Sequence, residues 1–155
     1  MKNPLKLLTV LFLIHSCASS NDLTNNKKET PKIVFLTYNI KKNTEKETEI
    51  IFEKLKIVNG KIKGFSNNNQ NQTMGDLECS FLDKNKNILQ IVHIKNPLKK
   101  LVEFVNNSGN LEKKIFEMDS TQFVIRAPYF ANTRFIEISE KTSGKTLKKI
   151  ITTKL

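Results

Sequence analysis

Short apolar runs, which recur about every ten residues from Lys32 to the C-terminus, constrain the fold of this 155-residue chain most strongly. They are rich in Ile, Val, Phe and Leu, and clusters of Asn, Gly and Asp separate them. Runs this short suit strands, because helices in globular proteins need longer segments with a period of 3.6 residues. The pattern predicts an all-β domain, an antiparallel immunoglobulin-like β-sandwich of about nine or ten strands.

In chain order, the expected strands are residues 33–40, 50–58, 61–64, 75–82, 88–94, 101–105, 111–118, 122–127, 134–139 and 146–153. The first run is apolar on both faces, which predicts a central strand. Asn59-Gly60 joins the second and third runs. Because this dipeptide tolerates the positive φ angles of a type I′ turn, it predicts a hairpin between them.

The run 75–82 alternates between apolar and polar side chains. Residues two apart in a strand share a face. The alternation therefore places Leu77, Cys79 and Phe81 inward, and Glu78 and Ser80 outward. Cys79 is interpreted as a small buried hydrophobic residue rather than a reactive thiol.

Residues 1–16 have the three-part layout of a secretory signal. Lys2 and Lys6 precede an apolar run from Leu7 to Ile14. A helix of that length spans only ~12 Å, far less than the ~30 Å hydrocarbon core of a bilayer. We therefore expect residues 1–16 to be a cleaved signal peptide.

The segment Ile14-His15-Ser16-Cys17 resembles the lipobox of bacterial lipoproteins, in which a small residue precedes an invariant cysteine. The resemblance implies that Cys17 receives a diacylglyceryl group and becomes the N-terminus. The expected location is then the cell envelope, with a lipid anchor in a bacterial membrane, the outer rather than the inner one. Ser16 and Ala18 also satisfy the small-x-small rule, so ordinary signal-peptidase cleavage after Ala18 is the alternative.

Residues 17–31 are dominated by Ser, Asn, Thr and charged side chains, a composition that cannot bury itself. They predict a flexible, lipid-anchored tether. A coil of this length spans about 20 Å, which would lift a domain off the lipid headgroups. The domain itself is expected at residues 32–155.

A second resemblance covers this domain and rests on short motifs in order: Tyr38, Gly75-Asp76-Leu77, Asp83-Lys84-Asn85, Asn96-Pro97 and Phe123-Val124-Ile125-Arg126-Ala127-Pro128. They are similar to the small N-terminal β-sandwich domain that precedes the catalytic domain in bacterial IgA-peptidase-type zinc metallopeptidases. The resemblance implies a non-catalytic accessory domain. The His-Glu-x-x-His pattern of the catalytic domain does not occur in this sequence.

The residues for several common chemistries are scarce. His93 is the only histidine after the signal segment, so zinc sites with two or three imidazoles cannot be built. His93 itself is interpreted as a structural or rim histidine. Five carboxylates could still pair as in a glycosidase, which keeps a small envelope hydrolase as the alternative function: Asp76, Glu78, Glu103, Glu117 and Glu137. We expect no catalytic residue, no cofactor and no metal.

Twenty-six Lys and Arg against fifteen Asp and Glu give a net charge of +11. The lysines are spread along the chain, and only Arg126 and Arg134 offer the planar guanidinium fork, so nucleic acid is not the expected partner. The expected partner is instead an anionic envelope component or another envelope protein.

Arg126 precedes Pro128-Tyr129-Phe130, where a proline ends the strand and a loop displays two aromatic side chains. Arg126, Tyr129 and Phe130 are therefore the predicted binding residues. In the alternative, Arg126 pairs with a carboxylate such as Glu103 while the two aromatics cover the end of the core. Taken together, the sequence predicts a non-catalytic envelope lipoprotein with a β-sandwich that serves as a binding or assembly module.

The lipobox generates the first testable prediction. Mass spectrometry of the mature protein should find a lipid-modified Cys17 at the N-terminus, and Cys17→Ala should shift the protein from the membrane to the soluble fraction. An unmodified N-terminus at Ser19 would contradict the prediction.

Overall fold

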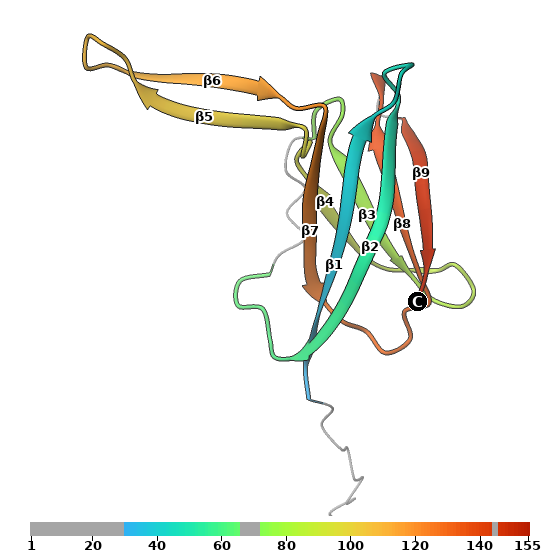
Figure 1. Cartoon of the computed structure of the whole chain (residues 1–155). Coiled ribbons are helices and arrows are strands. Elements are labelled where there is room, and N and C mark those ends of the chain that lie inside the picture. The colour runs from blue at the N-terminus through green and yellow to red at the C-terminus, as the bar shows by residue number, and fades with distance from the viewer. Residues whose placement is uncertain (1–29, 66–71, 144–145) are drawn as a thin grey trace, which may run out of the picture.

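The computed structural model describes residues 30–65, 72–143 and 146–155, which form nine strands and no α-helix (Figure 1). In chain order they are β1 (Lys32–Lys42), β2 (Thr48–Asn59), β3 (Leu77–Leu82), β4 (Ile88–Ile94), β5 (Lys99–Val105), β6 (Leu111–Glu117), β7 (Ser120–Pro128), β8 (Phe135–Lys141) and β9 (Leu147–Lys154). The all-β prediction is confirmed. The described residues contain no helical segment with the length and hydropathy of a membrane span. The predicted signal peptide and Cys17 lie outside the described residues.

The strands form three antiparallel sheets, with orders β2-β1-β7, β4-β3-β8-β9 and β5-β6. In Figure 1 the first two sheets lie against each other, and the β5-β6 hairpin projects to one side. β1 lies between β2 and β7, as predicted for a central strand.

One apolar core joins the two larger sheets. Alternate residues of β1 are buried and meet inward residues of β7, β3 and β8 in a single cluster, which includes Val34, Leu36, Tyr38, Ile40, Ile125, Ala127, Leu77, Cys79, Phe81, Ile136 and Ile138. Full burial of one aliphatic or aromatic side chain of this size contributes roughly 1.5–3 kcal/mol. This cluster is therefore the principal source of the domain's stability.

Tyr38 spans the core from β1. Its ring packs against Phe52 and Phe123, with centroid separations of 5.4 and 5.7 Å, and its hydroxyl lies 3.4 Å from Thr153 Oγ1 on β9. Burial raises the pKa of Tyr38 far above its ordinary value, so the hydroxyl stays protonated. The two ring contacts lie within the β2-β1-β7 sheet, and the hydrogen bond to Thr153 links Tyr38 to the opposite sheet.

The predicted faces of β3 are confirmed. Leu77, Cys79 and Phe81 are fully buried, whereas Glu78 and Ser80 are partly exposed. Burial, and to a lesser degree the charge of Glu78, raises the pKa of the Cys79 thiol. Cys79 therefore remains a neutral core residue, as interpreted from the sequence.

The hairpin predicted between residues 50–58 and 61–64 is wrong. β2 instead pairs along its length with β1, and Gly60 leaves the sheet with its amide donating to the Pro31 carbonyl at 2.8 Å. The physical reason is burial, because pairing with β1 places Ile50 and Phe52 against the core. The segment 61–64 offers only one apolar side chain to a strand.

A β-bulge interrupts the pairing of β1 with β2 between Thr37 and Tyr38. Thr37 lies opposite Lys54 while Tyr38 lies opposite Phe52, so Glu53 is the extra residue of β2. The Glu53 carboxylate accepts a 2.8 Å hydrogen bond from Asn39 Nδ2. Across the bulge the inward residues of β2 change from even-numbered to odd-numbered positions.

Burial on β3 generates the second prediction. Phe81→Ala should lower the free energy of unfolding by ~3 to 5 kcal/mol, because it removes a fully buried ring and leaves a cavity. Ser80→Ala, one residue away on the outward face, should change it by less than ~0.5 kcal/mol. Chemical denaturation measures both values. The reverse ranking would mean that the strand register is shifted by one residue.

Candidate functional site

The face of the β2-β1-β7 sheet that points away from the core carries the strongest candidate site. Its side chains form three cross-strand rows, each with one residue from β2, β1 and β7: Lys54–Thr37–Val124, Lys56–Phe35–Arg126 and Val58–Ile33–Pro128. The alternation of the three strands turns all nine side chains to this outer face. The sheet thus presents apolar and basic groups side by side.

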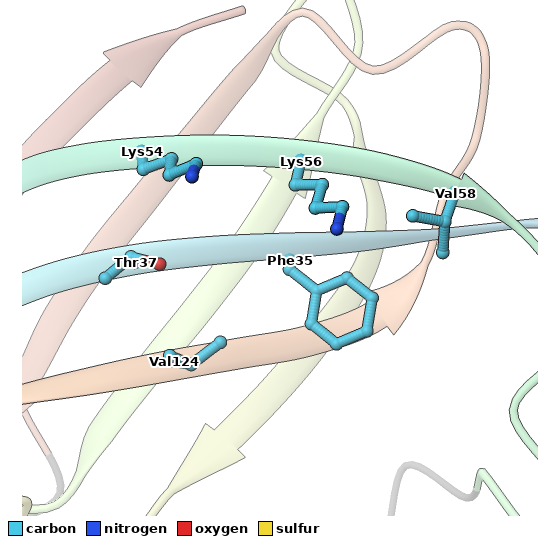
Figure 2. A pocket seen from close by; sticks show the side chains of 6 residues that line it. All are labelled: Phe35, Thr37, Lys54, Lys56, Val58 and Val124. Atoms are coloured by element: carbon cyan, nitrogen blue, oxygen red, sulfur yellow. The ribbon is translucent and has the colours of Figure 1, made fainter.

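A shallow hollow of about 410 Å³ lies on this face, and we call it the sheet hollow (Figure 2). It is lined by Phe35, Thr37, Lys54, Lys56, Val58 and Val124. Figure 2 shows the Phe35 ring directed from β1 toward β7, with the two lysines coming from β2. Its volume lies at the lower end of the range, ~300–1,000 Å³, that is usual for ligand sites.

The cations of this face are not neutralised by the described part of the protein. Lys54, Lys56 and Arg126 are exposed, and none forms an ion pair with a described carboxylate. Elsewhere lysines do find partners, as in the Lys148–Glu47 pair at 2.6 Å. The face therefore attracts anions.

The structure separates the three predicted binding residues. Arg126 lies on the outer sheet face beside Phe35, whereas Tyr129 and Phe130 line a second hollow of about 410 Å³ at the strand ends, together with Phe65. Phe130 is exposed, and Tyr129 is partly buried against the core. We call this second site the end hollow. It adjoins the sheet hollow at the Val58–Ile33–Pro128 row, because Val58 lines one hollow and Pro128 the other.

The alternative pairing of Arg126 with Glu103 is wrong. Glu103 lies on the projecting β5-β6 hairpin and pairs with Lys113 at 2.7 Å. Of the two aromatics expected to cover the end of the core in that alternative, Tyr129 packs against the core cluster.

Phe35, Lys54 and Lys56 were not predicted as site residues. The run 33–40 predicts burial on both faces, whereas the outer side of β1 is only partly covered. The alternation of Lys54 and Lys56 indicates a solvated strand face but not the aromatic ring beside it. Only the pairing of β1 with β2 could reveal that neighbour.

The five candidate carboxylates lie on different elements, and four of them form an ion pair with a lysine. The ion pairs are Glu103–Lys113 at 2.7 Å, Glu117–Lys99 at 3.5 Å, Glu137–Lys149 at 3.1 Å and Asp76–Lys95 at 3.0 Å. Glu78 lies 3.8 Å from His93 Nδ1, and this ring nitrogen also contacts Gln72 Nε2. Within the described ranges, no three His, Cys, Asp or Glu side chains gather closely enough to hold a metal ion.

Comparison with known proteins adds no relative, since no family model, curated protein or solved structure matches this chain. The lipobox and the accessory-domain resemblance therefore remain predictions.

Asp76 has a structural role at the corner that precedes β3. Its carboxylate accepts hydrogen bonds from the backbone amides of Thr73 and Asn96 and from Lys95 Nζ, at 2.8, 2.9 and 3.0 Å. Burial alone would raise the pKa of Asp76, but these hydrogen bonds lower it below its ordinary value. Gly75 is required here by its φ of +87° and because a Cβ would lie 2.7 Å from Asn96 Nδ2.

This corner generates the third prediction. Asp76→Asn should lower the free energy of unfolding at pH 7 by about 1–3 kcal/mol, since the neutral amide is a weaker acceptor for two amides and an ammonium. The wild-type advantage should shrink as pH falls below ~4, because a carboxyl with a lowered folded-state pKa loses its contribution on protonation. Denaturant titrations at pH 7 and pH 3 measure both effects.

Asp119→Asn is the matched control, because Asp119 is exposed and lies outside this corner. A pH-independent difference between wild type and Asp76→Asn would contradict the assigned charge effect.

Proposed function

We propose that this chain is a non-catalytic lipoprotein of the bacterial cell envelope, anchored through Cys17, with a β-sandwich that binds an anionic envelope component. The observation that carries the proposal is the Lys56–Phe35–Arg126 row, in which an aromatic ring lies between two cations without described acidic partners. Such a row offers both apolar contact and charge to a ligand.

The expected ligand carries repeated anionic groups. One exposed cation contributes only about 0.2–1 kcal/mol to an ion pair, so useful affinity needs several at once. Lys54 and Lys56 line the sheet hollow, and Arg126 lies opposite Phe35 on the same face, which makes three cations. Removal of residues 1–16 takes two lysines and no acid from the net charge of +11, which leaves a mature charge of +9. The whole domain then favours approach of an anionic ligand.

The strand order supports a variant of the immunoglobulin-like sandwich. If β1 and β7 are taken as strands B and E of that fold, then β3, β4, β8 and β9 take the places of C, C′, F and G. β2 occupies the edge position of strand A in the sheet, although it follows β1 in the chain. In chain order, the β5-β6 hairpin takes the place of strand D, but it forms a separate sheet. Sandwiches of this type commonly serve as binding or accessory modules, in keeping with the resemblance to the peptidase-associated domain.

The fourth prediction tests the site. The purified protein should bind labelled polyphosphate or phosphatidylglycerol vesicles, and added salt should weaken the binding. The double variant Lys56→Ser/Arg126→Ser should bind about tenfold more weakly, which corresponds to roughly 0.7 kcal/mol per cation. Fluorescence anisotropy and vesicle co-sedimentation distinguish a free polyanion from a lipid headgroup.

Lys100→Ser/Lys154→Ser is the control, since it removes the same charge from exposed positions outside both hollows. Its affinity should change less than twofold. Equal losses in the two double variants would assign the binding to net charge and reject the sheet hollow as the site.

A further inference from the structure

The β5-β6 hairpin, which we call the arm, projects from the sandwich and leaves both of its edges unpaired within the described residues (Figure 1). Its base is fixed by the hydrogen bond from the Met118 amide to the carbonyl of the buried Leu98, at 2.8 Å. At its tip, the Asn106 amide donates to the Asn110 carbonyl at 2.9 Å. An isolated two-stranded hairpin is marginally stable in water, so pairing with a further strand would stabilise the arm.

One face of the arm is unusually apolar for a solvent-exposed surface. Leu101 lies opposite Ile115, and Val105 lies opposite Leu111. The exposed fractions of these four side chains are 56%, 61%, 65% and 64%. The Glu103–Lys113 ion pair, at 2.7 Å, separates the two aliphatic pairs. The tip is polar, with the sequence Asn106-Asn107-Ser108-Gly109-Asn110, and is therefore unsuited to entering a lipid bilayer.

The hydrogen-bonding pattern shows which backbone groups of β6 are free. The Met118 amide donates to the Leu98 carbonyl and the Asn106 amide donates to the Asn110 carbonyl, so Leu98–Met118 and Asn106–Asn110 are hydrogen-bonded positions of the arm. In an antiparallel ladder hydrogen-bonded and non-hydrogen-bonded pairs alternate. The backbone amides and carbonyls of Leu111, Lys113 and Ile115 therefore point away from β5, toward the open edge.

The open edge of β6 is complementary to itself. When a second β6 is aligned antiparallel about Lys113, Leu111 lies opposite Ile115 of the second copy, and Glu112 lies opposite Lys114 of the second copy. The two Lys113 side chains meet at the centre, where each keeps its own Glu103. A shift of the centre to Glu112 or Lys114 places a lysine opposite an aliphatic residue. Of these three neighbouring registers, the Lys113 register alone matches both aliphatic and charged pairs.

We propose that two copies of this protein associate through their arms, with β6 pairing antiparallel to β6 about Lys113. The two hairpins then form one four-stranded sheet. On its apolar face, each outer row contains four aliphatic side chains: Val105 and Leu111 of one copy with Ile115 and Leu101 of the other. On the opposite face, two Glu112–Lys114 pairs cross the new junction. The contact is smaller than a standard interface, so the association is reversible and concentration-dependent.

Disulfide trapping tests the register. Residues facing each other in a hydrogen-bonded antiparallel pair have Cα atoms ~5.5 Å apart, within the range that a disulfide spans. In the full chain carrying Cys17→Ser, Lys113→Cys should give a covalent dimer under mild oxidation, seen on non-reducing gels. The remaining native thiol, Cys79, is fully buried.

Glu103→Cys is the matched control. It breaks the same ion pair but lies on β5, at the far edge of the arm. The proposal predicts at least fivefold more dimer from Lys113→Cys than from Glu103→Cys. Equal trapping, preferential trapping through Glu103→Cys, or no trapping of either variant would overturn it.

A charge exchange tests the same junction independently. Glu112→Lys or Lys114→Glu, each added to Lys113→Cys, should reduce dimer formation about three- to tenfold, because like charges then face each other twice. The combination of both exchanges should restore it. The Asn106–Glu112 hydrogen bond at 2.6 Å is lost in the single Glu112→Lys variant and in the combination alike. Failure of the combination to restore the dimer would therefore reject the Lys113 register.

Discussion

The burial of alternate residues of β1 between two sheets is the constraint on which the rest of the structure depends. Val34, Leu36, Tyr38 and Ile40 all point inward, and hydrogen bonds to β2 and β7 occupy both edges of the strand. Strict alternation then turns Ile33, Phe35 and Thr37 outward. The same strand therefore organises the core and supplies the middle residue of each row on the outer face.

The alternation of residues 77–81 was sufficient to assign the faces of β3, because its inward positions are apolar and its outward positions are polar. The turn between the predicted strands 75–82 and 88–94 is also encoded locally. The Asp83 carboxylate accepts hydrogen bonds from the backbone amides of Asn85 and Asn87, which are local contacts that a short motif encodes. Faces and turns of this kind depend on neighbours in the sequence.

Pairing between distant segments could not be predicted in the same way. Asn59-Gly60 is an ordinary signal for a tight turn, but the apolar strand 33–40 competes for the same segment and buries more surface. The neighbours of Arg126 were missed for a related reason. Phe35 and Lys56 become neighbours of Arg126 through the pairing of β1 with β7 and with β2. These residues are far apart in the sequence, so a local pattern cannot predict that they are neighbours.

The bulge at Glu53 has a consequence for how β2 can sit on its neighbour. Above and below it the inward side chains have opposite parity, with Ile50 and Phe52 on one side and Leu55 and Ile57 on the other. Without the extra residue, the parity of Ile50 and Phe52 would continue along β2 and would turn Lys54 and Lys56 inward. The extra residue thus allows both ends of β2 to turn apolar side chains inward while Lys54 and Lys56 stay on the outer face beside Phe35.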